Sequence, residues 1–110
     1  MELSRREASV ERSFCEQLKR SGCLVYKFIS PGNNGVPDRI VITPQGQVIF
    51  VELKTKTGKL RSDQVCQIRK LVRHGQYVRV LHGSDEVDRF VKEVVPNEVH
   101  PIRLSEKSDR

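Results

Sequence analysis

The chain contains no tryptophan, and aromatic residues make up only 5% of its 110 residues. Proteins that bind single-stranded nucleic acid without sequence preference stack bases on aromatic side chains, so this composition argues against such a platform. The sequence also has no long apolar run and no apolar segment at its N-terminus. We therefore expect neither a membrane span nor a secretion signal.

Cysteine is scarce as well, and the three cysteines are scattered without a C-x-x-C pair. They do not combine with the histidines at the spacing of zinc ligands, which argues against a zinc site. We predict that they are reduced core residues of a cytosolic protein and not parts of a disulfide framework. These cysteines are Cys15, Cys23 and Cys66.

Positive charge, by contrast, is plentiful. Lysine and arginine number 20 against 14 acidic residues, so the net charge is +6 and the isoelectric point is about 9.6. Such a surface suits a polyanion, because lysine and arginine neutralise phosphates and release counterions. A basic surface without such a partner is the alternative. With few aromatic residues, the backbone of duplex or branched DNA is the partner that fits better.

The length allows one domain with a modest core, and the hydrophobic periodicity predicts an α/β fold. The expected elements are a helix over 4–20, a strand over 23–29, a hairpin of strands over 38–43 and 48–54, a helix over 62–74, a strand over 76–82 and a helix over 85–95. The second hairpin strand is almost wholly apolar until Glu52, which is typical of a central strand covered on both faces. The strand after the second helix should run parallel to it.

The helix ends carry recognisable signals. Ser4, Ser62 and Ser84 are predicted N-caps, and Gly22 and Gly75 are predicted to end the first two helices. Two polar residues are expected on or beside the buried helix faces, namely Glu11 and Gln64. The second helix is expected to bury an apolar stripe of Val65, Ile68, Leu71 and Val72.

The hairpin brings together the residues with the clearest chemical potential. Asp38 begins its first strand, and Glu52 and Lys54 lie at the end of the second, so antiparallel pairing makes these ends neighbours. Glu52 and Lys54 are two residues apart and leave the same face of the sheet. Mg²⁺ prefers oxygen ligands, so Asp38 and Glu52 could share an ion that polarises a phosphate. Lys54 could then orient a water or stabilise developing charge.

A Glu-x-Lys pair on a strand is more often a surface ion pair. Here, however, the pair ends the most apolar strand of the chain, where burying charge without a partner or a metal costs several kcal/mol. Glu11 could supply another oxygen ligand, or it could reach water. Gln64 could contact the attacking water, hold Lys54 in place or satisfy a helix end.

Basic residues near these positions are candidates for gripping phosphates. The best single patch is the loop over residues 56–61, which follows directly from the strand of Lys54, although a solvated basic loop is the alternative reading. The candidate DNA-binding residues are Lys56, Lys59, Arg61, Arg12, Arg5 and Arg6.

An ordered set of residues resembles the VRR-NUC domain, a branch of the PD-(D/E)xK nuclease superfamily: Glu11, Gly35-Val36-Pro37-Asp38-Arg39, Val51-Glu52-Leu53-Lys54, Gly58-Lys59-Leu60 and Gln64. The resemblance runs from the first helix to about His82 and implies a nuclease domain over 1–95 followed by a charged tail over 96–110. It implies a restriction-endonuclease-like core of order α-β-β-β-α-β, with a mixed sheet flanked by helices.

The resemblance also implies a Mg²⁺- or Mn²⁺-dependent endodeoxyribonuclease. The catalytic residues would be Asp38, Glu52 and Lys54, with Gln64 as their polar support. The metal would be held by Glu11, Asp38 and Glu52.

The chain is similar to the stand-alone viral and bacterial members of this family, which look like homodimeric Holliday-junction resolvases. The resemblance thus implies branched DNA as the substrate, a homodimer, and a location in the cytoplasm of a bacterium or a virus-infected host cell. Flap cleavage, less selective nicking and DNA binding without catalysis are the alternatives. The sequence does not identify the dimer surface, and the last helix with the apolar residues near Val94 and Val95 is one candidate for it.

Overall fold

The computed structural model describes residues 5–94. Its elements are, in order, α1 (Arg5–Arg20), β1 (Leu24–Lys27), β2 (Arg39–Ile42), β3 (Val48–Lys54), α2 (Ser62–Arg73), β4 (Tyr77–His82) and α3 (Gly83–Val94). The strands form one sheet of order β1-β2-β3-β4, in which only the β3–β4 pair is parallel. The predicted α/β fold, the hairpin and the parallel strand pair are therefore confirmed, and β3 is a central strand. Ser4, Val95 and the predicted tail over 96–110 lie outside the described residues.

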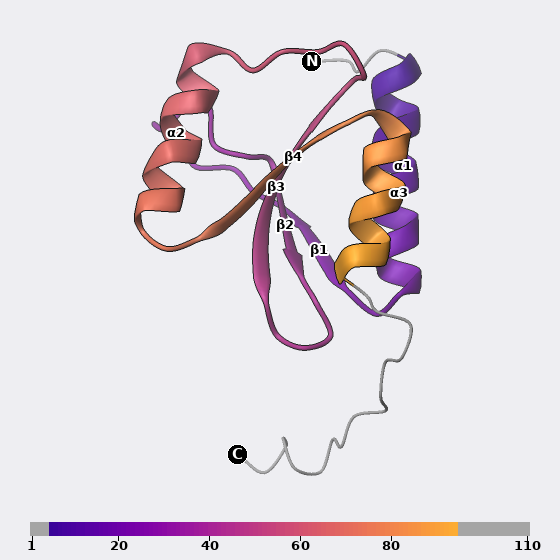
Figure 1. The fold of residues 1–110 in the computed structure, drawn as a ribbon. Helices are drawn as coiled ribbons and strands as arrows, with labels where there is room; N and C mark the ends of the chain where they lie inside the picture. Colours follow the sequence, from indigo (N-terminus) through magenta and orange to yellow (C-terminus); the bar gives the residue numbers. More distant parts are fainter. Residues whose placement is uncertain (1–4, 95–110) are drawn as a thin grey trace, which may run out of the picture.

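Two helices, α1 and α3, pack side by side against one face of the sheet, and α2 lies on the other face (Figure 1). The core lies between the sheet and the α1–α3 layer, where the rings of Phe14 and Phe90 stack with their centroids 6.3 Å apart. Val41 of β2 and Val51 of β3 are fully buried and belong to the same core. This layer gives the hairpin a rigid support. None of the described helices is long and apolar enough to cross a bilayer.

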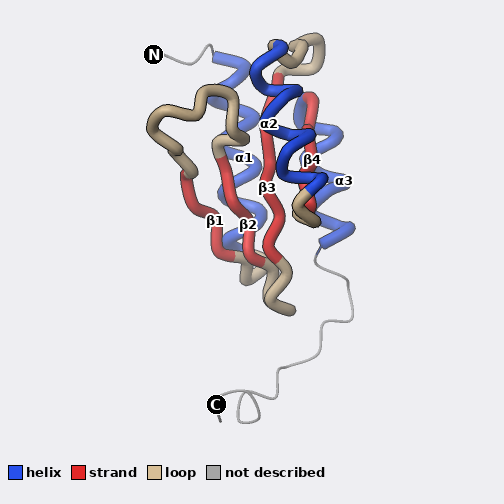
Figure 2. The backbone as a smooth tube through the Cα atoms, turned by 90° about the vertical axis from the view of Figure 1, so that its left-hand side faces the viewer, coloured by secondary structure: helices blue, strands red, loops and turns tan. Residues whose placement is uncertain are grey.

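The face of the sheet that carries α2 is only partly covered. Figure 2 shows α2 over β3 and β4, with β1 and β2 beside it. Leu24 pairs with Ile42 and Tyr26 pairs with Ile40, so these apolar residues share one face. Leu24 is 50% exposed and Tyr26 is 53% exposed.

The predicted burial of the apolar stripe on α2 is wrong in part. Val72 is 54% exposed, and Gln64 is the buried residue of the helix. The reason is that α2 covers one side of the sheet and leaves its own outer flank in solvent. Cys66 lies on α2 and is exposed, so it is not the core residue that was predicted, whereas Cys23 is buried.

The helix ends also differ from the prediction. Arg61, not Ser62, is the N-cap of α2. The helix α3 begins at Gly83, so Ser84 lies inside its first turn instead of capping it. Gly83 has φ +80°, a left-handed conformation that lets the chain pass directly from β4 into α3. The ends of α1 and α2 lie before Gly22 and Gly75, as predicted.

Candidate active site

The pairing of β2 with β3 brings the predicted catalytic residues to one end of the sheet. Arg39 pairs with Val51 at the last step of the ladder, so Asp38 and Glu52 follow at adjacent positions on the two strands. The Nζ atom of Lys54 lies 3.8 Å from Oε2 of Glu52. Glu52 is only 6% exposed, so this is not a solvated surface pair. The hairpin thus places Asp38, Glu52 and Lys54 together, as their spacing predicted.

A close approach of two backbones fixes the loop before Asp38. Gly35 has φ +94°, and a Cβ atom at this position would lie 2.5 Å from the carbonyl oxygen of Asp63 at the start of α2. No other residue fits there without displacing the backbone. Pro37 is fully buried and anchors the next step of the chain. The loop that carries Asp38 is therefore held against the N-terminus of α2.

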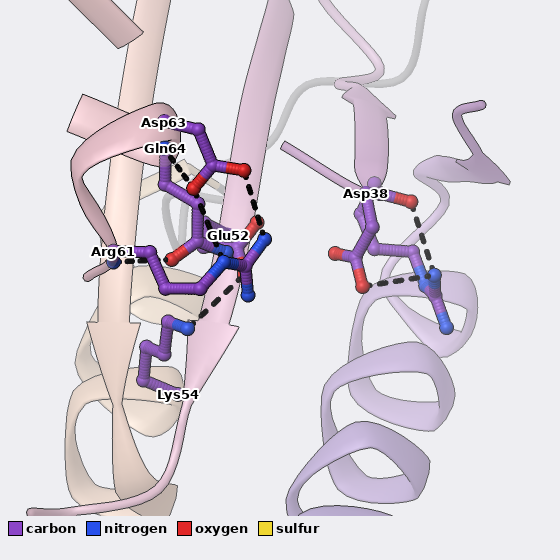
Figure 3. Close-up of polar contacts among 7 residues, drawn as sticks. Asp38, Glu52, Lys54, Arg61, Asp63 and Gln64 are labelled. Atoms are coloured by element: carbon purple, nitrogen blue, oxygen red, sulfur yellow. Dashed lines mark hydrogen bonds and ion pairs between the residues drawn. The ribbon is translucent and has the colours of Figure 1, made fainter. Parts of the chain in front are cut away.

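Gln64 connects the start of α2 to the buried carboxylate. Its Nε2 donates to Oε2 of Glu52 at 3.0 Å, and its Oε1 accepts the backbone N–H of Arg61 at 2.9 Å. Figure 3 shows Gln64 and Lys54 grouped around Glu52, with Asp38 on the neighbouring segment. The sequence left several roles open for Gln64. In the structure its Oε1 satisfies the start of α2, and the side chain that its Nε2 holds in place is Glu52.

The two carboxyl groups resist ionisation. Burial, followed by the nearby charge of Asp38, raises the pKa of Glu52 from 4.5 to about 7, while Lys54 and Arg61 act in the opposite direction. Burial also raises the pKa of Asp38, against the attraction of Lys27 and Lys54. Two neighbouring acids with raised pKa values are typical of a functional site, and a nearby cation would stabilise both charges.

The donors at this end of the sheet fit a hard divalent cation. Within residues 5–94, Oδ1 of Asp38 is a buried oxygen atom without a hydrogen-bond partner. Asp38 also lines a small cavity of about 60 Å³, together with Glu7, Val10, Glu11, Leu53 and Lys54. Mg²⁺ is commonly bound through one or two carboxylates, with water and substrate phosphate as the other ligands. Asp38 and Glu52 meet that requirement.

Glu11, the third predicted ligand, is engaged elsewhere. It lines the small cavity, but its carboxylate forms an ion pair with Arg39, whose side chain is 9% exposed. The described part of the chain has no group of three histidine, cysteine or acidic side chains arranged to hold a metal ion. The predicted trio of ligands is therefore not assembled, although Glu11 borders the site.

Sequence reasoning gave Arg39 no role of its own. The signal was present, because Arg39 alternates in phase with the buried Val41 and so points into the protein. Its partner on α1 could be known only from the packing of that helix. Glu7, one helical turn before Glu11, also lines the cavity and was not predicted as a site residue.

The candidate DNA-binding residues are dispersed around the site. A second groove of about 680 Å³ begins at Thr55 and Lys56, directly after Lys54, and runs between the N-terminal ends of α1 and α3. Its basic lining includes Arg6 and Lys56, which were predicted, and Arg89, which was not. Arg61 forms an ion pair with Asp63, with Nε and Oδ1 3.1 Å apart. The remaining three candidates are exposed: Arg5, Arg12 and Lys59.

A mixed sheet that carries two acids and a lysine at one end, with helices on both faces, is the arrangement that the resemblance to the PD-(D/E)xK nucleases implied. The family model of the VRR-NUC domain matches residues 7–85. The chain therefore belongs to the VRR-NUC domain family and carries a nuclease domain.

Two individual proteins are similar to the chain. It is 40% identical over 80 residues to "Putative nuclease p44" of Acyrthosiphon pisum secondary endosymbiont phage 1, a match that covers 73% of this chain and 86% of the phage protein. A solved structure described as a VRR_NUC domain superposes with a TM-score of 0.75 at 29% identity, covering 81% of this chain and 97% of that one. The likeness thus extends over the whole described site.

Proposed function

We propose that the protein is a Mg²⁺- or Mn²⁺-dependent endonuclease that cuts branched DNA, and that it resolves Holliday junctions as a homodimer. The observation that carries the proposal is the buried Glu52, held by Gln64 at 3.0 Å beside Lys54, together with the Asp38 Oδ1 atom, which has no hydrogen-bond partner among residues 5–94. The raised pKa of Glu52 supports the proposal, because carboxyl groups with perturbed pKa values cluster at functional sites.

Each residue of the site has a distinct task in phosphodiester hydrolysis. Asp38 and Glu52 would hold the divalent cation, which supplies positive charge to the scissile phosphate and acidifies a water. Lys54 orients the attacking water and places its ammonium where negative charge grows on the phosphate. Gln64 keeps the Glu52 carboxylate in one orientation through its Nε2 hydrogen bond.

The larger groove offers a path for the DNA backbone next to the scissile phosphate. Lys56, Arg6 and Arg89 line it, and these charges can grip phosphates without reading bases. Two acidic residues line the same groove, and one of them, Glu86, accepts the backbone N–H of His82 at 2.7 Å. This hydrogen bond engages the Glu86 carboxylate within the protein. The attraction of the groove for a polyanion comes from its three basic side chains.

Replacement of Lys56 and Arg89 by alanine should weaken DNA binding and reduce its salt dependence. Each lost phosphate contact lowers the slope of log Kd against log salt concentration by about 0.9 for duplex DNA, so the double variant should lose up to about 2 in slope. Fluorescence anisotropy of a labelled four-way junction in EDTA measures this. Arg73→Ala, which removes an exposed charge from α2, is the matched control and should leave the slope unchanged. Equal slopes in the double variant and Arg73→Ala would place the DNA elsewhere.

The open face of β1 and β2 is the better candidate for the dimer surface. The earlier candidate, Val94, is partly buried and packs against the hydrophobic core. Leu24 and Tyr26 are half exposed on a continuous apolar sheet face, which is a common property of protein interfaces. A two-fold dimer would present two sites to a symmetric junction.

The proposed function is tested by comparing cleavage of a four-way junction, a 5′ flap and a linear duplex, with Mg²⁺ and with EDTA. Symmetric paired cuts confined to the junction, and only with metal, are the expected result. Light scattering should give a dimeric mass that Leu24→Glu reduces to a monomer. Preference for the flap would make the protein a flap nuclease, and binding without cutting in Mg²⁺ or Mn²⁺ would leave a DNA-binding protein.

A further inference from the structure

A buried arginine lies beside two acidic residues of the candidate site. Arg39 is the first residue of β2, and its side chain is 9% exposed. A guanidinium remains charged in proteins, and a buried charge is costly unless it is paired. The position of Arg39 is therefore sustained by the carboxylates around it.

The guanidinium of Arg39 contacts two of the three acids that the sequence predicted as metal ligands, namely Glu11 and Asp38. It forms the ion pair with Glu11, and its Nη1 lies 3.7 Å from Oδ2 of Asp38 and donates to the Asp38 carbonyl oxygen at 3.0 Å. The negative charge of Glu52 is close enough to raise the pKa of Arg39 against the effect of burial. The side chain of Arg39 thus touches Glu11 of α1 and Asp38, the residue before β2.

These contacts divide the acids into two sets. Oδ2 of Asp38 is turned towards Arg39, whereas Oδ1 is the buried oxygen without a partner in the described residues. Glu11 gives its carboxylate to Arg39. Asp38 therefore keeps one carboxylate oxygen available for a cation, whereas the charge of Glu11 is compensated by Arg39.

The charge balance points the same way. Glu7, Glu11, Asp38 and Glu52 carry four negative charges when ionised, and Arg39 and Lys54 supply two positive ones. One divalent cation is enough to balance the remaining excess of negative charge. In two-metal sites the ions lie about 3.5–4 Å apart and need bridging or additional anionic ligands. Here the acid that would serve a second ion is the one paired with arginine, in a cavity of about 60 Å³.

We propose that Arg39 is a positioning residue that keeps Glu11 out of the metal coordination sphere, so that each chain binds one divalent cation through Asp38 and Glu52. The proposal rests on the proposed function only in requiring that the site binds a metal. It assigns Glu11 to the support of Arg39 and sets the number of ions per site.

Calorimetric titration of the DNA-free protein with Mn²⁺ tests this directly, with no dependence on cleavage. Wild type should bind one ion per chain, and Glu11→Gln should bind one ion with an affinity within about threefold of wild type. Asp38→Asn should bind more than about tenfold more weakly. Arg39→Gln releases Glu11 and should gain a second ion, and the double variant R39Q/E11Q should lose that second ion again. Circular dichroism melts confirm that each variant is folded.

If Arg39→Gln does not fold, the comparison of Glu11→Gln with Asp38→Asn still decides the matter. Two ions in wild type, or a loss of affinity in Glu11→Gln as large as that in Asp38→Asn, would overturn the role of Arg39 and leave the metal-dependent function intact. Wild type that binds no Mn²⁺ at millimolar concentration and cuts no DNA would refute the proposed function, and the inference with it.

Discussion

Asp38→Asn and Lys54→Met should each lower the rate of DNA cleavage by about 10²–10³-fold or more. Asparagine keeps the shape of the Asp38 side chain but removes the charge that would hold the cation. Methionine keeps the apolar stem of Lys54 and removes the ammonium that lies 3.8 Å from Glu52. Single-turnover rates on a labelled four-way junction in saturating Mg²⁺ measure the chemical step apart from binding.

Binding of the junction should survive both substitutions. The phosphate contacts proposed here lie in the groove of Lys56 and Arg89, and Asp38→Asn also relieves repulsion between a carboxylate and a phosphate. Asp88→Asn is the isosteric control, because Asp88 is an exposed acid of α3 that accepts a hydrogen bond from Gln17 at 2.8 Å. Cleavage by Asp38→Asn at the rate of the control would remove Asp38 from the catalytic assignment.

The catalytic hairpin could be predicted because local rules determine it. The turn between the strands is closed by a hydrogen bond from the Gly46 amide to the Thr43 carbonyl at 2.8 Å. With so short a connection, the turn sets the register, and the strand period of two sets the face on which Glu52 and Lys54 lie. The spacing of these residues in the sequence was therefore enough to bring them together.

The inward position of Gln64 could be predicted, but its hydrogen-bond partner could not. The helical period placed it on the inward face of α2, and it is buried there. Which group it would meet depends on how α2 approaches the sheet, and this is fixed by the tight contact of Gly35 with Asp63. The same placement explains why Val72 is exposed, since periodicity reveals an apolar face but not how much of that face is covered.

The pairing of Glu11 with Arg39 could not be predicted from spacing at all. Both residues lie next to apolar positions, and each could have reached water by extending its side chain. Their contact arises because α1 packs against the sheet, and this packing is set by the core around Phe14 and Phe90. Residues that support a site through tertiary packing leave no periodic signal, whereas residues on one hairpin do.

Glu52→Gln should stabilise the metal-free protein at pH 8 by up to roughly 3 kcal/mol, because each unit of pKa shift is worth about 1.4 kcal/mol. The pKa of Glu52 is raised from 4.5 to about 7, so between these values the folded protein binds a proton more tightly than the unfolded chain. The wild-type free energy of unfolding must then fall as the pH rises through this window and level off above it. Glutamine removes the ionisation, keeps the volume and can still accept the hydrogen bond from Gln64.

Urea denaturation in EDTA at pH 5 and pH 8 measures the effect, which should nearly vanish at pH 5. Glu93→Gln, at an exposed acid of α3 paired with Arg79 at 2.7 Å, is the control and should change stability by no more than about 1 kcal/mol at either pH.

Addition of Mg²⁺ at pH 8 should reverse the order of stability. A cation that binds only the folded wild type raises its free energy of unfolding by mass action, while Glu52→Gln loses that response. If Glu52 served only as a structural partner of Lys54, the same substitution would destabilise the protein at pH 8 and Mg²⁺ would change nothing. The sign of one difference in stability, measured with and without metal, therefore separates a metal-binding nuclease site from a structural ion pair.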